Sequence, residues 1–99
     1  LSSIIIPPIY KQIGKRIKSA RRSNFRTIKF MIEKDVGKKF VTQQELAKIL
    51  NVSFQAVGRY EKGLMCISID KLMTISNYLN KPLDYFLNQD VEEHNVYPN

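Results

Sequence analysis

The sequence predicts an all-α protein, and two observations support that fold class. Apolar residues recur every three or four positions through most of the chain, which places them on one face of a helix. The segments with this spacing open on serine, threonine or proline and close on glycine or asparagine, residues that start and stop helices. No segment other than residues 3–6 offers the pattern of a strand.

Length and charge fit one small domain that binds an acidic partner. The chain has 99 residues and a formal net charge of +7, so nucleic acid and an anionic membrane surface are both suitable partners. No segment approaches the roughly 20 apolar residues that span a bilayer. The apolar residues 4–9 lack the basic flank of a signal peptide. We therefore expect a cytoplasmic, nucleoid-associated protein that has no membrane partner.

The residue types that carry out catalysis or bind metals are scarce. Cys66 is the only cysteine and His94 the only histidine, so we expect neither an intrachain disulfide nor a cluster of metal ligands. The sequence also offers no nucleophile–base pair and no phosphate-binding loop. We expect a protein that is not an enzyme and that holds no metal and no cofactor.

The first helix is predicted to begin after Pro8, where an apolar stripe with helical spacing starts. The stripe consists of Ile9, Ile13, Ile17, Ala20 and Arg21. Basic residues fall away from it, toward solvent, at Lys11, Lys15, Lys18 and Arg22. Because residues 1–32 contain no acid, we interpret this basic run as a sign of a polyanion nearby.

Residues 23–41 allow two interpretations. A second stripe with helical spacing runs through them and stops before Gly37; it consists of Phe25, Ile28, Ile32 and Val36. Either the first helix continues into this segment, or a new helix begins near Ser23 or Asn24. The sequence favours a separate helix over residues 24–36.

The helix that follows has the strongest start signal in the chain. The Thr42 side chain is expected to accept a hydrogen bond from the Glu45 N–H, while the Glu45 carboxylate reaches back to the Thr42 N–H. This arrangement is a capping box. The helix is predicted to end near Leu50.

A further helix follows through a short turn at Asn51 and Val52, where asparagine tolerates the left-handed conformation that such turns need. Ser53 caps this second helix, and Gly63 ends it. Two short helices that cross closely need a small residue at the crossing and an apolar one that locks them; these are Ala47 and Val57. Residues 42–63 therefore predict a helix-turn-helix whose second helix projects far enough to enter the DNA major groove.

The exposed face of this second helix carries the candidate base-reading residues. Gln55 and Arg59 are four positions apart and share that face, with Ser53 and Phe54 at its leading end. Glutamine can pair with adenine through two hydrogen bonds, arginine can do so with guanine, and phenylalanine can pack on a thymine methyl group. Gly58 costs roughly 1 kcal/mol in a helix interior relative to alanine, so we expect a backbone or DNA close to it.

Candidate phosphate contacts flank this face. Gln43 and Gln44 lie in the first turn of the preceding helix, where free N–H groups suit phosphate oxygens. Lys62 flanks the second helix from the other side. Taken alone, the three glutamines are also typical of a solvated surface, Phe54 of a core or a partner interface, and Arg59 of an ion pair with Glu61 or another surface acid. Only the whole set is specific.

The rest of the chain predicts two more helices and a tail. Ser68 is expected to cap a helix over residues 69–79, which Asn80 stops. Pro82 suits the first turn of a short helix that ends near Leu87. The expected organisation is an N-terminal tail, a helix-turn-helix domain and an acidic C-terminal tail, at residues 1–8, 9–87 and 88–99.

Taken together, these residues resemble the lambda-repressor/Cro-type family of regulators, also called the XRE family. The resemblance covers over half of the chain, in residues 13–22 and 42–87. It is carried by Thr42-Gln43-Gln44-Glu45-Leu46-Ala47, Arg59-Tyr60-Glu61-Lys62-Gly63, Ile69-Asp70-Lys71-Leu72, Tyr78-Leu79-Asn80 and Leu83-Asp84-Tyr85-Phe86-Leu87.

The resemblance implies a five-helix domain that binds a palindromic operator as a homodimer. It implies base contacts from Phe54, Gln55 and Arg59 and a phosphate contact from Gln43. It also implies an ion pair between Arg21 and Glu61, which would be structural. One departure is that twenty residues separate Arg21 from Thr42, where the family has a short connection; residues 23–41 therefore contain an insertion.

We expect a sequence-specific binder of double-stranded DNA, a repressor of phage or bacterial type that acts by covering its operator. One alternative is an antitoxin that represses its own operon and binds a toxin protein through residues 23–41 or 88–99. Another is a protein-interaction module that has the fold but no role on DNA.

Overall fold

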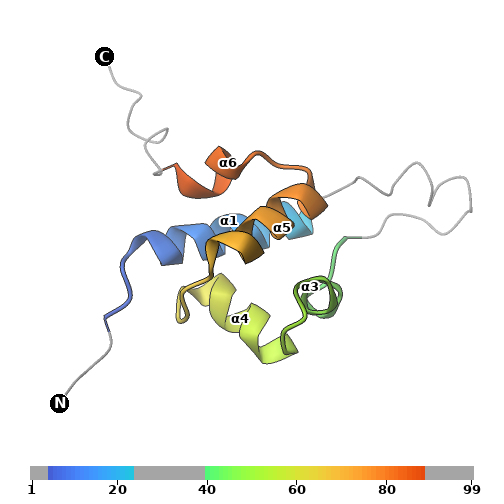
Figure 1. The fold of residues 1–99 in the computed structure, drawn as a ribbon, viewed down its shortest axis with the longest axis horizontal. Helices are drawn as coiled ribbons and strands as arrows, with labels where there is room; N and C mark the ends of the chain where they lie inside the picture. The colour runs from blue at the N-terminus through green and yellow to red at the C-terminus, as the bar shows by residue number, and fades with distance from the viewer. Residues whose placement is uncertain (1–4, 24–39, 89–99) are drawn as a thin grey trace, which may run out of the picture.

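The computed structural model describes residues 5–23 and 40–88, so the helix predicted for residues 24–36 lies outside them. The described residues are all-α, as the sequence predicts, and contain five helices and no strand (Figure 1). The helices are α1 (Ile9–Arg22), α3 (Gln43–Leu50), α4 (Phe54–Lys62), α5 (Ile69–Leu79) and α6 (Leu83–Leu87). None of the described helices is long and apolar enough to cross a membrane.

Helix α1 lies in the middle of the domain and packs against α4, α5 and α6. Its predicted stripe is buried from Ile13 onward. Gly14, which no pattern in the sequence singles out, sets how closely α1 approaches α4. A Cβ atom built on Gly14 would lie 2.2 Å from the carbonyl oxygen of Tyr60 and 2.6 Å from that of Glu61. Only a residue without a side chain fits between the two backbones.

Helices α3 and α4 pack on each other and form the predicted pair with a tight turn. The Thr42 Oγ1 atom accepts a hydrogen bond from the Glu45 N–H at 3.0 Å, as the capping box requires. Asn51 is left-handed, with φ at 58°, which confirms the predicted turn. The N–H of Val52 donates to the carbonyl oxygen of Ala47 at 3.0 Å and closes the end of α3.

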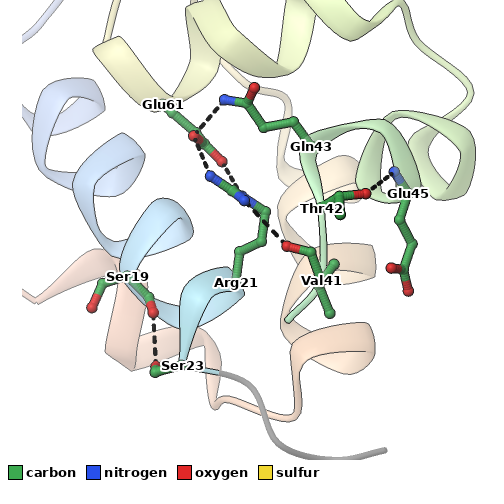
Figure 2. A network of polar contacts seen from close by, with 8 residues as sticks. All are labelled: Ser19, Arg21, Ser23, Val41, Thr42, Gln43, Glu45 and Glu61. Carbon is green, nitrogen blue, oxygen red and sulfur yellow. Dashed lines mark hydrogen bonds and ion pairs between the residues drawn. The ribbon is translucent and has the colours of Figure 1, made fainter. Parts of the chain in front are cut away.

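The Glu45 carboxylate has a different partner from the one predicted. It points away from Thr42 in Figure 2 and accepts a hydrogen bond from the Tyr78 hydroxyl of α5. A capping-box glutamate bends back over its own helix start, whereas here a phenol from another helix draws the side chain outward. Glu45 thus links α3 to α5.

Ser68 precedes α5 at the predicted position, but its hydroxyl makes no hydrogen bond to the helix backbone. It bonds instead to the carboxylate of Asp70, and this hydrogen bond lowers the pKa of the Asp70 carboxyl. The serine hydroxyl donates to this carboxylate, which also takes hydrogen bonds from the backbone N–H groups of Asp70 and Lys71 in the first turn. Asn80 ends α5 in the left-handed conformation, with φ at 59°.

Helix α6 packs along α1. Its Phe86 side chain is buried, and polar contacts also join the two helices. Gln12 of α1 donates a hydrogen bond to the carbonyl oxygen of Asn88, and Arg16 donates one to that of Tyr85. The Arg16 guanidinium also lies 5.2 Å from the centre of the Tyr85 ring.

Candidate nucleic-acid interface

Helix α4 turns one side into the core and leaves the predicted reading side exposed. Ala56, Val57 and Tyr60 are buried. Gln55 and Arg59 are exposed, and Phe54 at the start of the helix is 47% exposed, which is high for an aromatic residue. The amide, guanidinium and phenyl groups named as base-reading candidates are therefore accessible from outside.

Ser53 is exposed, but its hydroxyl makes a hydrogen bond within the protein. The Oγ atom accepts a hydrogen bond from the N–H of Ala56 at 3.0 Å and so caps α4, as predicted. Gly63 ends the helix in the left-handed conformation, with φ at 74°.

Gly58 lies on the outer side of α4 with open space around it. A Cβ atom added there would meet nothing within 4 Å among the described residues, so packing within this part of the protein does not require glycine. Gly58 lines a surface groove of about 510 Å³ whose other residues are Gln43, Phe54, Gln55, Arg59, Lys62 and Leu64. The groove thus gathers most of the predicted DNA-binding residues.

A buried polar network ties α1 to the start of α3 and the end of α4 (Figure 2). The Arg21 Nε atom donates to Glu61 Oε2 at 2.7 Å, and Arg21 Nη2 donates to Glu61 Oε1 at 3.0 Å. Arg21 Nη1 also donates to the carbonyl oxygen of Val41 at 3.1 Å. The two charged side chains are only 10% and 3% exposed, so this is the buried ion pair that the family resemblance implied.

Gln43 takes part in this network. Its Nε2 atom donates to Glu61 Oε1 at 2.8 Å, which holds the amide in a fixed position between α3 and α4. One amide proton and the amide oxygen remain for a ligand. Gln44, the other candidate in the same helical turn, is exposed.

Two residues of the basic run on α1, which the sequence linked to a polyanion but not to this site, belong to the same surface. Lys18 and Arg22 of α1 line a hollow of about 570 Å³ together with Gln43, Gln44 and Phe54. Both are exposed. Their shared face on α1 was visible in the sequence, but nothing in the sequence indicated that this face adjoins the start of α3.

The described residues contain no cluster of possible metal ligands. No group of three or more histidine, cysteine, aspartate or glutamate side chains in residues 5–23 and 40–88 lies close enough together to hold a metal ion. The arrangement is suited to binding: an exposed helix, amide and guanidinium groups on its outer side, and basic residues beside it.

Comparison with known proteins identifies the domain. Residues 41–86 match the family model described as helix-turn-helix. Residues 41–86 are a helix-turn-helix domain. This match confirms the resemblance to the lambda-repressor/Cro-type family. For the matched residues, this family agrees with the prediction of a binding domain without catalytic chemistry.

Three curated relatives are similar to this chain in sequence. An uncharacterised HTH-type transcriptional regulator of Rickettsia conorii is 32% identical over 91 residues, which are 92% of this chain and 60% of the relative. One from Rickettsia prowazekii is 35% identical over 57 residues, or 58% of this chain and 43% of the relative. An uncharacterised transcriptional regulator in the ATPase CF(0) region of Rhodospirillum rubrum is 43% identical over 44 residues, or 44% of this chain and 41% of the relative. The chain thus spans at most 60% of the length of these relatives.

Proposed function

We propose that the protein binds double-stranded DNA in a sequence-specific manner and regulates transcription as a repressor. The observation that carries this proposal is the outer side of α4. It presents Gln55 and Arg59 around Gly58, where an added Cβ atom would meet no atom of the described residues within 4 Å beyond the backbone of its own helix. A helix enters the major groove most closely where it carries no side chain, which gives Gly58 a reason that packing does not supply.

The base-reading step rests on Gln55 and Arg59, with Phe54 at the leading end. In the major groove a glutamine amide can bond N6 and N7 of adenine, and an arginine can bond O6 and N7 of guanine. The Phe54 ring can cover a thymine methyl group. These contacts read sequence, whereas contacts to phosphates fix the register of the protein on the duplex.

The phosphate contacts come from both sides of α4. On one side lie Gln43 and Gln44, whose helix α3 directs free N–H groups outward, together with Lys18 and Arg22 of α1. On the other side lies Lys62. Cations on both flanks of a projecting helix match the two phosphate backbones that border a major groove.

In this proposal, repression results from the size of the bound protein and from the twofold symmetry of a homodimer on its operator. Two copies of the domain on a palindromic operator would place their α4 helices in successive major grooves, about 34–36 Å apart. A homodimer that covers one operator excludes polymerase from the same duplex, and no reaction is needed.

Selection of bound sequences from a random duplex pool, followed by sizing of the complex, tests this proposal. We expect one enriched palindromic sequence and two protein chains per duplex. Absence of any duplex binding at about 150 mM salt, where specific sites are still occupied, would leave only the protein-interaction alternative.

We expect Arg59→Ala to relax the base preference at one position of each half-site. The lost bidentate contact is worth about 1–3 kcal/mol of discrimination. Competition between the selected duplex and versions changed at single base pairs measures this loss. Arg22→Ala is the matched control, because it removes an arginine next to the phosphates and should leave the preference at every position intact.

Lys18→Ala should weaken binding to all duplexes by a similar factor. Removing one phosphate contact lowers the slope of log affinity against log salt by about one. Titrations of a selected and a random duplex at several salt concentrations measure this slope. Lys48→Ala, at the far end of α3, should leave it unchanged; equal effects of the two changes would remove Lys18 from the interface.

A further inference from the structure

The end of helix α6 is hydrogen-bonded to α1, next to the basic side of that helix. The carbonyl oxygen of Asn88, the last described residue, accepts a hydrogen bond from Gln12, in the first turns of α1. One turn further along α1, Arg16 donates a hydrogen bond to the carbonyl oxygen of Tyr85 in α6. Gln12 and Arg16 are four positions apart and therefore form one row along α1. The described part of the chain therefore ends at one end of this row.

A row of basic residues on α1 lies next to the row formed by Gln12 and Arg16. It consists of Lys11, Lys15, Lys18 and Arg22, all exposed, which repeat at helical spacing. A helix advances about 100° per residue, so this row lies between the row that holds α6 and the side of α1 that packs on α4. Two of its members, Lys18 and Arg22, line the hollow that includes Gln43 and Gln44. The same surface thus adjoins both the end of α6 and the proposed DNA interface.

The segment that follows Asn88 has the charge and the length to reach this surface. Residues 89–99 contain Asp90, Glu92 and Glu93 and no lysine or arginine. Eleven residues can span at most about 36–40 Å. The distance along α1 from Gln12 to Arg22 is only about 15 Å, at 1.5 Å per residue. The local concentration of these carboxylates around the basic row is therefore high.

We propose that the acidic segment at residues 89–99 occupies the basic row of α1 and competes there with the phosphates of DNA. The contact is electrostatic and lies on an exposed face, so each ion pair is weak and salt reverses it. The segment thereby increases the selectivity of DNA binding. A specific operator also makes base contacts and so displaces the segment more readily than a random duplex, which offers phosphates alone. This inference rests on the proposed DNA-binding function for its consequence, but not for the contact itself.

Carbodiimide coupling, which joins a carboxylate directly to an amine in contact with it, tests the contact without DNA. The reagent is applied to the full chain as an equal mixture of unlabelled and ¹⁵N-labelled protein. We expect links from Asp90, Glu92 or Glu93 to Lys11, Lys15 or Lys18 within single chains, with loss of these links at about 500 mM salt. Links spread equally to Lys48 and Lys71, on α3 and α5, or found only between labelled and unlabelled chains, would overturn the proposal.

Duplex titrations test the competition with the triple variant Asp90→Asn/Glu92→Gln/Glu93→Gln. At about 50 mM salt we expect roughly threefold to tenfold tighter binding to a random duplex, a smaller gain on the selected operator, and no gain at high salt. The control Asp70→Asn/Asp84→Asn removes two exposed acids elsewhere and should give a smaller gain per charge. If both variants gain the same affinity per removed charge, the proposed competition is overturned. If no form binds any duplex, the proposed function fails instead, and the coupling experiment still decides the contact.

Discussion

Replacing Arg21 with methionine is expected to lower the free energy of unfolding by about 3–5 kcal/mol, because it leaves a buried carboxylate without its cation. Arg21 supplies two hydrogen bonds to Glu61 and one to the carbonyl oxygen of Val41, and the Glu61 side chain is only 3% exposed. Methionine fills a similar volume but offers no donor. Urea unfolding followed by circular dichroism measures the change.

The partner variant and the neighbour provide the controls. Glu61→Met alone should also be strongly destabilising, while the double variant Arg21→Met/Glu61→Met should lose less than the sum of the two, because it leaves no buried charge. Arg22→Met, one position away and exposed, should change stability by less than about 0.5 kcal/mol. If Arg21→Met behaves like Arg22→Met, the ion pair does not hold α1 to the helix-turn-helix domain.

The second large effect is expected from Gly14 of α1 and Gly58 of α4, whose replacement by alanine should change stability with opposite signs. Gly14→Ala forces a methyl group to within 2.2 Å of the Tyr60 carbonyl oxygen, a backbone atom that cannot turn aside. The helices α1 and α4 must then separate, which costs about 1–3 kcal/mol or more. Gly58→Ala meets no atom within 4 Å and should stabilise the helix by about 0.5–1 kcal/mol.

Gly58→Ala also separates stability from function. If α4 enters the major groove as proposed, the added methyl group should weaken binding to the selected duplex although the protein becomes more stable. Thermal unfolding and duplex titration of the same sample measure both effects. A variant that is more stable and binds as tightly as the parent would show that the duplex does not approach Gly58. Destabilisation by Gly58→Ala would show instead that the helix packs differently from the structure.

Much of the fold was predictable because its signals are local. The start of α1 after Pro8, the Thr42 and Ser53 caps and the left-handed Asn51 depend on residues within a few positions of one another. The outward placement of Gln55 and Arg59 follows from the same helical spacing that buries Val57 and Tyr60. Two local predictions were nevertheless wrong in detail, since Glu45 and Ser68 bond to Tyr78 and Asp70 in place of the expected backbone groups. In both cases a side chain that the motif does not include offered a hydrogen-bond partner.

The sequence by itself determined the fold class, the Thr42 and Ser53 caps and the turn, because periodicity and capping are properties of contiguous residues, and its motifs carried the family resemblance. Only the tertiary structure decided that Gly14 is the contact point of α1 and α4, that Gln43 is held by Glu61, and that the basic row of α1 adjoins the helix-turn-helix domain. These features join residues far apart in the chain. They depend on the distance and rotation between packed helices, which helical spacing alone leaves undetermined.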